Sequence, residues 1–178
     1  MDYLQIRVVK IEPDIETDTF DCGNTDLNAF LKDDALRYFD ERMAVTYILL
    51  YKKQIIAYYC LLNDKVTFDT GQGNERLLWN RFNRKNKIPN PKRRQNYPAV
   101  KLGRLAVSMH FKRQGLGRFI LDGIKQMLIQ KTDTGCRFLT VDAYSTALSF
   151  YLKNEFQYIS SKDESENTRL MYYDLKTG

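Results

Sequence analysis

A short basic stretch with two glycines has the residue types that bind phosphate. It covers Lys112–Arg118 and reads Lys-Arg-Gln-Gly-Leu-Gly-Arg. The apolar run Leu102–Val107 before it predicts a strand, and the apolar periodicity from Leu116 to about Lys131 predicts a helix. Glycine allows the backbone to approach a ligand closely, and the first N–H groups of a helix are free to donate hydrogen bonds. Together with the helix dipole and the basic side chains, the stretch predicts an anion site.

Two well-known nucleotide-binding loops do not match this stretch. The NTPase loop requires Gly-Lys followed by Ser or Thr, whereas Gly117 is followed by Arg118. The dinucleotide-binding loop requires a third glycine where Ile120 stands, although Asp142 would suit as the acid at the end of the next strand. The connection through residues 108–114 is also several residues too long for that loop. Both nucleotide folds are therefore disfavoured.

A second motif follows about thirty residues later, and the two motifs together resemble the GNAT superfamily of N-acetyltransferases. Ala147–Phe156 reads Ala-Leu-Ser-Phe-Tyr-Leu-Lys-Asn-Glu-Phe and is similar to the family pattern Ala-x-x-Phe-Tyr-x-x-x-Gly-Phe. The first stretch resembles Gln/Arg-x-x-Gly-x-Gly/Ala, with Lys112 in the first place. Glu155 replaces the family glycine, so we expect the turn there to be made differently, and Tyr144 replaces a frequent asparagine. The resemblance covers the chain except for residues 64–98.

The resemblance implies that acetyl-CoA is the co-substrate and that no metal takes part. In this family the loop amides bind the pyrophosphate, the edge of the preceding strand binds the pantetheine arm, and a primary amine attacks the thioester directly. The implied cofactor-binding residues are Leu105, Ala106, Val107, Lys112, Arg113, Gln114, Gly115, Leu116, Gly117, Arg118, Tyr144 and Phe150.

Tyr151 occupies the place of the family's general acid. A phenol has a pKa near 10, above that of a thiol, so it carries its proton near pH 7 and has one to donate to the leaving thiolate. The alternative is a tyrosine that is packed in the core with a satisfied hydroxyl. The general base stays open, with Asp69, Glu75 and a water chain as alternatives.

Several local features bear on the acceptor of the acetyl group. Phe20–Gly23, Leu27–Leu31 and Leu102–Val107 resemble segments of bacterial GNAT toxins of toxin–antitoxin pairs, members of which acetylate the α-amine of aminoacyl-tRNA. The basic stretch Arg76–Arg94 would suit contact with an RNA backbone, and an antitoxin would then be a further partner. The acceptor is otherwise an unassigned primary amine, on a small molecule or a protein N-terminus. A third alternative is a non-catalytic module that binds CoA or RNA.

The elements expected around these motifs give an α+β protein with a mixed sheet, in one domain of residues 1–178. A helix over Asp26–Phe39 and a hairpin without the favoured Asn-Gly turn precede a basic insert at about 64–98. That insert is expected to be a long surface connection with a short helix at Glu75–Phe82, and Arg104 within its strand is typical of a buried ion pair. A further helix is expected over Tyr144–Asn154. The expected strands are Gln5–Lys10, Val45–Leu50, Ile55–Leu62, Val100–Val107, Phe138–Ala143, Phe156–Ile159 and Thr168–Leu175.

The composition indicates a folded protein of a reducing compartment. The chain has 178 residues and a formal net charge of +6. Its three cysteines are odd in number and far apart, which argues against a disulfide framework, and the single His110 argues against zinc. Neither a signal peptide nor an apolar run of about 20 residues is visible, so we expect a cytoplasmic location without membrane contact. The oligomeric state stays open.

Overall fold

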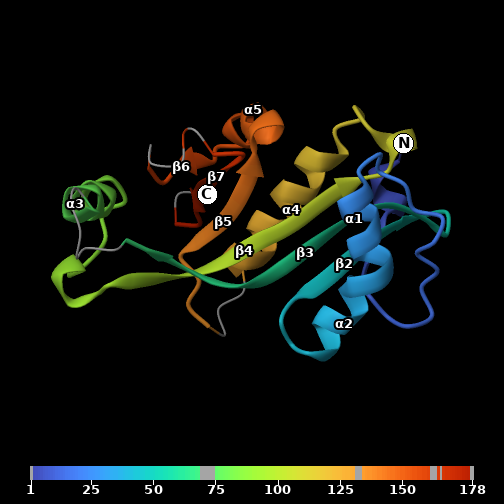
Figure 1. Cartoon of the computed structure of the whole chain (residues 1–178), viewed down its shortest axis with the longest axis horizontal. Helices are drawn as coiled ribbons and strands as arrows, with labels where there is room; N and C mark the ends of the chain where they lie inside the picture. The colour runs from blue at the N-terminus through green and yellow to red at the C-terminus, as the bar shows by residue number, and fades with distance from the viewer. Residues whose placement is uncertain (1, 69–74, 131–133, 161–163, 165, 177–178) are drawn as a thin grey trace. The chain divides into compact units, whose positions relative to one another are not determined.

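The computed structural model describes residues 2–68, 75–130, 134–160, 164 and 166–176. In this part of the chain seven strands form one mixed sheet with the order β1-β2-β3-β4-β5-β7-β6 (Figure 1). The β4–β5 pair is parallel, and the pairs β1–β2, β2–β3, β5–β7 and β6–β7 are antiparallel. The expected α+β fold with a mixed sheet is therefore confirmed. The strands are β1 Arg7–Lys10, β2 Val45–Tyr51, β3 Gln54–Thr67, β4 Asn96–Val107, β5 Phe138–Tyr144, β6 Gln157–Tyr158 and β7 Thr168–Asp174.

Two compact units divide the chain, and each is described by itself. The first comprises Met1–Asn63 and Leu102–Ile124, and the second comprises Asp64–Lys101 and Lys125–Gly178. The α-helices are α1 Thr25–Ala29, α2 Ala35–Asp40, α3 Glu75–Lys85, α4 Leu116–Gln130 and α5 Leu148–Lys153. By these bounds β3, β4 and α4 each contribute residues to both units.

In the first unit a helical segment packs on the β2–β3 hairpin. Asn24 caps the segment by accepting a hydrogen bond from the Leu27 N–H, as its residue type favours. Between α1 and α2 the chain forms a π-helical turn, Phe30–Asp34, which the sequence pattern did not predict. The hairpin itself was predicted; Lys52 and Lys53 form its turn with φ of 47° and 67°. Positive φ at both central residues is the geometry that Asn-Gly usually supplies.

In the second unit the stretch 64–98 is not the surface connection that we expected. β3 continues to Thr67, β4 begins at Asn96, and α3 is longer than the expected Glu75–Phe82. Residues 69–74 lie outside the described part of the chain. The described part of the stretch is ordered because it contributes to a cluster of apolar, mostly aromatic side chains. These side chains alternate with charged ones in the sequence, so the composition of the stretch alone did not reveal them. The buried members of the cluster are Val66, Phe68, Trp79, Phe82, Tyr97, Ala99, Phe138 and Tyr172.

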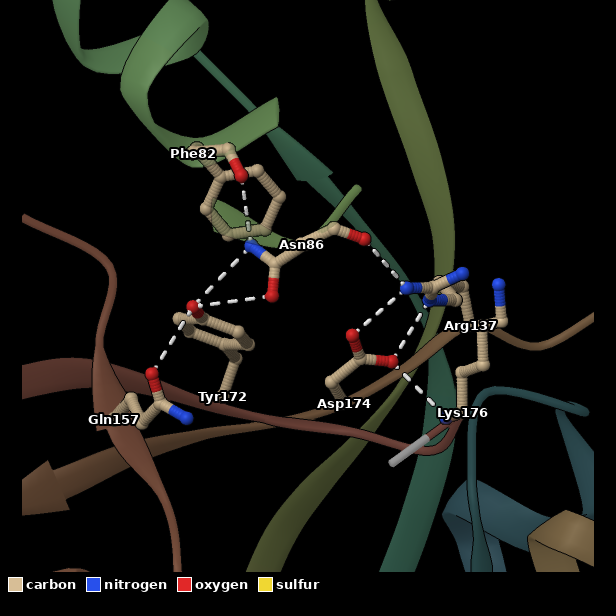
Figure 2. Close-up of polar contacts among 7 residues, drawn as sticks. All are labelled: Phe82, Asn86, Arg137, Gln157, Tyr172, Asp174 and Lys176. Atoms are coloured by element: carbon tan, nitrogen blue, oxygen red, sulfur yellow. Dashed lines mark hydrogen bonds and ion pairs between the residues drawn. The ribbon is translucent and has the colours of Figure 1, made fainter. Parts of the chain in front are cut away.

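A buried polar network attaches the C-terminal end of α3 to the strands of the second unit (Figure 2). The Asn86 side-chain amide donates to the Phe82 carbonyl at 2.9 Å and to the Tyr172 hydroxyl at 3.3 Å. Arg137 donates to the Asn86 carbonyl at 2.9 Å and holds both carboxylate oxygens of Asp174 at 2.8 Å. This bidentate pair is the stronger kind of charge-assisted contact. Hydrogen bonds and aromatic packing together therefore fix α3 on the strands of its unit.

The C-terminal part of the second unit differs from the expectation at its turns. Tyr144 ends β5 instead of starting a helix, and α5 begins at Leu148 after a 3-10 turn. After α5, Glu155 has φ +68°, the left-handed conformation that a glycine adopts readily. The expectation of a differently made turn is therefore wrong, since the glutamate takes the glycine conformation.

No helix within the described ranges has both the length and the apolarity that crossing a membrane requires. Cys22, Cys60 and Cys136 are free thiols.

Candidate functional site

The loop before α4 has a backbone shape that two left-handed residues define. Arg113 has φ 62° and Gly115 has φ 80°. The carbonyl of Gln114, between them, accepts a hydrogen bond from the Tyr3 hydroxyl. A Cβ atom added to Gly115 would lie 3.2 Å from that same hydroxyl oxygen. The close approach of Tyr3 and the positive φ both favour glycine at this position.

Consecutive backbone N–H groups of this loop are free to bind an anion. The first hydrogen bond of α4 runs from the Phe119 N–H to the Gly115 carbonyl at 3.1 Å. Within the described chain, the N–H groups of residues 113–118 have no acceptor. The first turn of α4 contains no acidic side chain, and the helix is 15 residues long. Free amides at a helix N-terminus form an anion site, and their number suits a group with several phosphate oxygens.

The basic side chains of the loop differ in their surroundings. Lys112 is exposed, but its Nζ is already engaged, since it donates to the Cys22 carbonyl at 2.7 Å. Arg118 lies 3.5 Å from Asp122, one helical turn later, and both are mostly exposed. Arg113 is exposed, and no carboxylate in the described ranges lies within ion-pair distance of it. Arg113 is therefore available to an anionic ligand, and the cofactor-binding role of Lys112 stays a prediction.

The Phe20–Gly23 segment is fixed beside this loop by contacts that the sequence did not indicate. The Asp21 carboxylate accepts from the Gly23 N–H at 2.7 Å and from the Asn28 amide at 2.8 Å. The Gly23 N–H, and then Asn28, hold the pKa of Asp21 below its usual value. The Met109 N–H, just before the loop, donates to the Asp21 carbonyl at 2.9 Å. Turn residues were visible here, but their partner Asn28 in the following helix was not.

The strand edge before the loop is only partly covered. Leu105 and Val107 are half-buried, while Ala106 is buried in the core of the first unit. The parallel β4–β5 ladder covers Ala99–Lys101 and Phe138–Thr140, so residues 105–107 are not part of it. These residues stay candidates for contact with an extended ligand, the pairing mode of a sheet edge.

Tyr151 lies in α5 of the second unit among aromatic rings. Its side chain is buried, with the Phe150 and Phe156 rings at 5.1 Å and 5.3 Å between centroids. Burial raises the pKa of Tyr151 to about 12. Within the described residues, the Tyr151 hydroxyl has no hydrogen-bond partner. This argues against a core tyrosine with a satisfied hydroxyl. Phe150 is half-buried, and Tyr144 at the end of β5 is exposed.

The structure does not identify either of the two named candidates, Asp69 and Glu75, as the general base. Glu75 is buried at the start of α3. Asp69 lies outside the described residues. Asp142, which was considered as a dinucleotide-binding acid, pairs with Lys101 at 2.6 Å instead.

An exposed basic surface lies on α3. Arg81, Arg84 and Lys85 are spaced at i, i+3 and i+4 and line an open pocket. The sequence from Arg76 to Gln95 contains no acidic residue. We call these three residues and their basic neighbours the α3 basic surface, and the neighbours are Arg76, Lys87, Lys92, Arg93 and Arg94.

Comparison with known proteins identifies similar folds and a matching family. Residues 91–177 match the model of a family described as an acetyltransferase (GNAT) domain. A tyrosine-to-phenylalanine variant of KacT is 26% identical, with 97% of this chain and 96% of that chain covered and a TM-score of 0.75. AtaT complexed with acetyl-methionyl-tRNAfMet is 23% identical over 97% and 96% of the two chains, with a TM-score of 0.77. A variant of the AtaT toxin bound to acetyl-CoA and the C-terminus of the antitoxin AtaR is 21% identical over 97% and 95%, with a TM-score of 0.74. No curated protein matches the sequence significantly.

Proposed function

The chain carries an acetyltransferase domain of the GNAT family, and we propose that it transfers acetyl from acetyl-CoA to the α-amine of an aminoacyl-tRNA. The free amides of residues 113–118 are the observation that supports the co-substrate, because a diphosphate requires several converging donors. Exposed Arg113 adds a full positive charge to these partial ones. The half-buried edge at Leu105–Val107 would pair with the extended pantetheine arm. Acetyl-CoA itself supplies a thioester carbon that an amine can attack.

Tyr151 is proposed to act as the general acid. As the amine nitrogen bonds to the acetyl carbon and the C–S bond breaks, Tyr151 donates its phenolic proton to the departing sulfur. A hydroxyl without a partner in the described chain is free for this role. Burial raises the pKa of Tyr151 to about 12, so the phenol is protonated near neutral pH.

An α-amine acceptor reduces the need for a base in the protein. Its pKa is about 8, whereas a lysine side chain has about 10.4, so a far larger fraction is neutral near pH 7. The amine can then lose its second proton to water.

The α3 basic surface supports a nucleic-acid substrate. Arg81, Arg84 and Lys85 present three exposed charges on a helix that the Asn86 network holds in place. Phosphate contacts supply most of the affinity in such interfaces. AtaT, which is similar in fold, was solved with acetyl-methionyl-tRNAfMet. An acceptor of this kind suggests the cytoplasm as the location, and the antitoxin of the AtaT complex suggests an antitoxin as partner.

One assay tests the proposal and its alternatives. The protein is incubated with labelled acetyl-CoA and, separately, charged tRNA, free polyamines and peptides. We expect label on charged tRNA only. Label on polyamines or peptides alone would show that these amines, and not aminoacyl-tRNA, are the acceptor. Binding of CoA without transfer would indicate a non-catalytic module.

The role of Tyr151 is tested by Tyr151→Phe. We expect kcat to fall roughly tenfold or more with little change in acetyl-CoA affinity, because only proton donation is lost. Tyr59→Phe is the matched control, since Tyr59 is also buried and burial raises its pKa. Unchanged turnover in Tyr151→Phe would remove this residue from the mechanism.

A further inference from the structure

The end of α5 forms a complete helix-capping motif around a residue that is unusual there. The Phe156 N–H donates to the Tyr151 carbonyl at 3.0 Å, and the Glu155 N–H donates to the Leu152 carbonyl at 3.0 Å. These two bonds define a Schellman motif, whose left-handed position is usually glycine. Here that position is Glu155 with φ +68°. A left-handed conformation is unfavourable for a residue with a Cβ atom, so other contacts must hold it.

Lys125 of α4 supplies those contacts from within the second unit. Its side chain is only 6% exposed, which is unusual for a lysine. The Nζ atom donates to the Asn154 carbonyl at 2.8 Å and lies 3.4 Å from a carboxylate oxygen of Glu155. The Tyr173 ring centre is 4.0 Å from the same atom, which gives the buried ammonium a cation–π contact.

The contacts of Lys125 act on the two residues that close the capping motif. Asn154 is the cap residue, and its carbonyl is one of the groups that a helix end leaves unpaired. A lysine at the C-terminal end of a helix also interacts favourably with the negative end of the dipole. The carboxylate of Glu155 is mostly exposed, so the ion pair alone would contribute little. The buried bond to the Asn154 carbonyl is therefore the principal contact.

The geometry of this helix end reaches Tyr151 directly. The Tyr151 carbonyl accepts the closing hydrogen bond, and the Tyr151 ring packs on the ring of Phe156 at 5.3 Å. A change in the cap would thus move the backbone at Tyr151 and the Phe156 ring that packs against it. We propose that Lys125 is a positioning residue for Tyr151. Lys125 holds the end of α5 in the left-handed turn that glycine usually makes, although Glu155 occupies that position. This inference rests on the proposed role of Tyr151 as the general acid.

The principal experiment compares kcat and KM in Lys125→Met and in a double variant. We expect Lys125→Met to lower kcat roughly fivefold or more and to leave the KM for acetyl-CoA within about twofold, because proton donation depends on geometry. Adding Glu155→Gly should restore most of the lost kcat, since glycine needs no support in the left-handed turn. Lys153→Met is the matched control, because Lys153 is an exposed lysine of α5 itself, and it should change neither constant.

Further measurements keep the inference testable if a variant is unstable or if Tyr151 is not the acid. Lys125→Gln retains a donor for the Asn154 carbonyl and should lose less kcat than Lys125→Met. Hydrogen exchange of the Glu155 and Phe156 amides, which needs no activity, should accelerate in Lys125→Met and slow again with Glu155→Gly. In a Tyr151→Phe background Lys125→Met should lower kcat no further. Unchanged exchange, or a kcat loss that Glu155→Gly does not reduce, would overturn the role of Lys125. Unchanged kcat in Tyr151→Phe alone would overturn only the acid.

Discussion

The guanidinium carbon of Arg104 lies 3.8 Å from the centre of the Phe30 ring. The sequence suggested a buried ion pair for Arg104, but no carboxylate in the described residues lies within ion-pair distance of it. The ring belongs to the π-helical turn, so strand β4 stabilises that turn through a cation–π contact.

Replacing Arg104 by methionine should therefore destabilise the protein without breaking an ion pair. We expect a loss of about 1–2 kcal/mol in the free energy of unfolding, measured by urea denaturation. The loss should shrink in a Phe30→Leu background, because the ring that receives the cation is already absent. Equal losses in both backgrounds would indicate that Arg104 acts only through the packing of its stem.

Gly115→Ala should weaken acetyl-CoA binding more than it destabilises the fold. Alanine has a Cβ atom and is strained in the left-handed conformation of this position, and its methyl group would also approach the Tyr3 hydroxyl. Relief of both strains would shift the loop amides. We expect a drop in affinity of roughly tenfold by titration calorimetry. Gly123→Ala is the control: outside the neighbouring backbone of α4, no atom of the described residues lies within 4 Å of its added Cβ, and alanine should stabilise α4 by about 0.5–1 kcal/mol.

Alkaline pH should affect stability before it affects catalysis. Burial raises the pKa of Tyr58 and raises that of Tyr151 to about 12, so the folded state favours the neutral phenols. Their contribution to stability is fully present below the unfolded pKa of about 10 and is lost as pH rises through the folded values. Urea unfolding at pH 8, 10 and 11 should show a decline that begins near pH 10 and is shallower in Tyr151→Phe. A kcat that falls between pH 8 and pH 10 would contradict a Tyr151 that keeps its proton.

Neutralising Arg81, Arg84 and Lys85 to glutamine should weaken binding of charged tRNA and leave acetyl-CoA affinity unchanged. The slope of log affinity against log salt should become less negative by up to about two to three, close to one for each lost phosphate contact. The matched charge control replaces three exposed basic residues of the first unit by glutamine, namely Lys10, Lys32 and Arg37. Equal effects from both sets would indicate a dependence on net charge alone.

Replacing Arg137 alone should lower the free energy of unfolding more than replacing both Arg137 and Asp174. Arg137→Met leaves the buried Asp174 carboxylate without its guanidinium partner, and such a loss costs about 3–5 kcal/mol. Adding Asp174→Leu should recover part of this loss in the free energy of unfolding, measured with denaturant. A double variant less stable than the single one would show that Asp174 is held by its other contacts.

The sequence predicts the elements well where the pattern is local. The apolar periodicity from Leu116 predicted α4, and its apolar residues Ile120, Leu121, Ile124 and Leu128 are buried. Lys125 was missed, although it follows Leu121 by one helical turn, because a lysine is normally assigned to solvent. The bond from Tyr3 to Gln114 joins residues 111 positions apart, and no local pattern encodes such a contact.

In the candidate site too, local patterns were predictable and contacts between distant residues were not. Glycines and basic residues marked the loop, while the contact of Lys112 with Cys22 depends on the fold. The helix before the hairpin was predicted from its apolar stripe, but the π-helical turn within it was not. Intrinsic propensity does not distinguish a single i→i+5 turn from an α-helix, so only the tertiary contacts of Phe30 could reveal it.

The pair of Lys125 and Glu155 has a consequence for the ancestry of the chain. The two residues are 30 positions apart, yet the left-handed turn at Glu155 depends on the support that Lys125 gives it. If an ancestor had glycine at position 155, the lysine was tolerated first and the glutamate came second, because the reverse order passes through an unsupported turn. Homologues should therefore show glutamate here chiefly where lysine accompanies it. A search pattern that insists on the glycine would overlook this whole lineage.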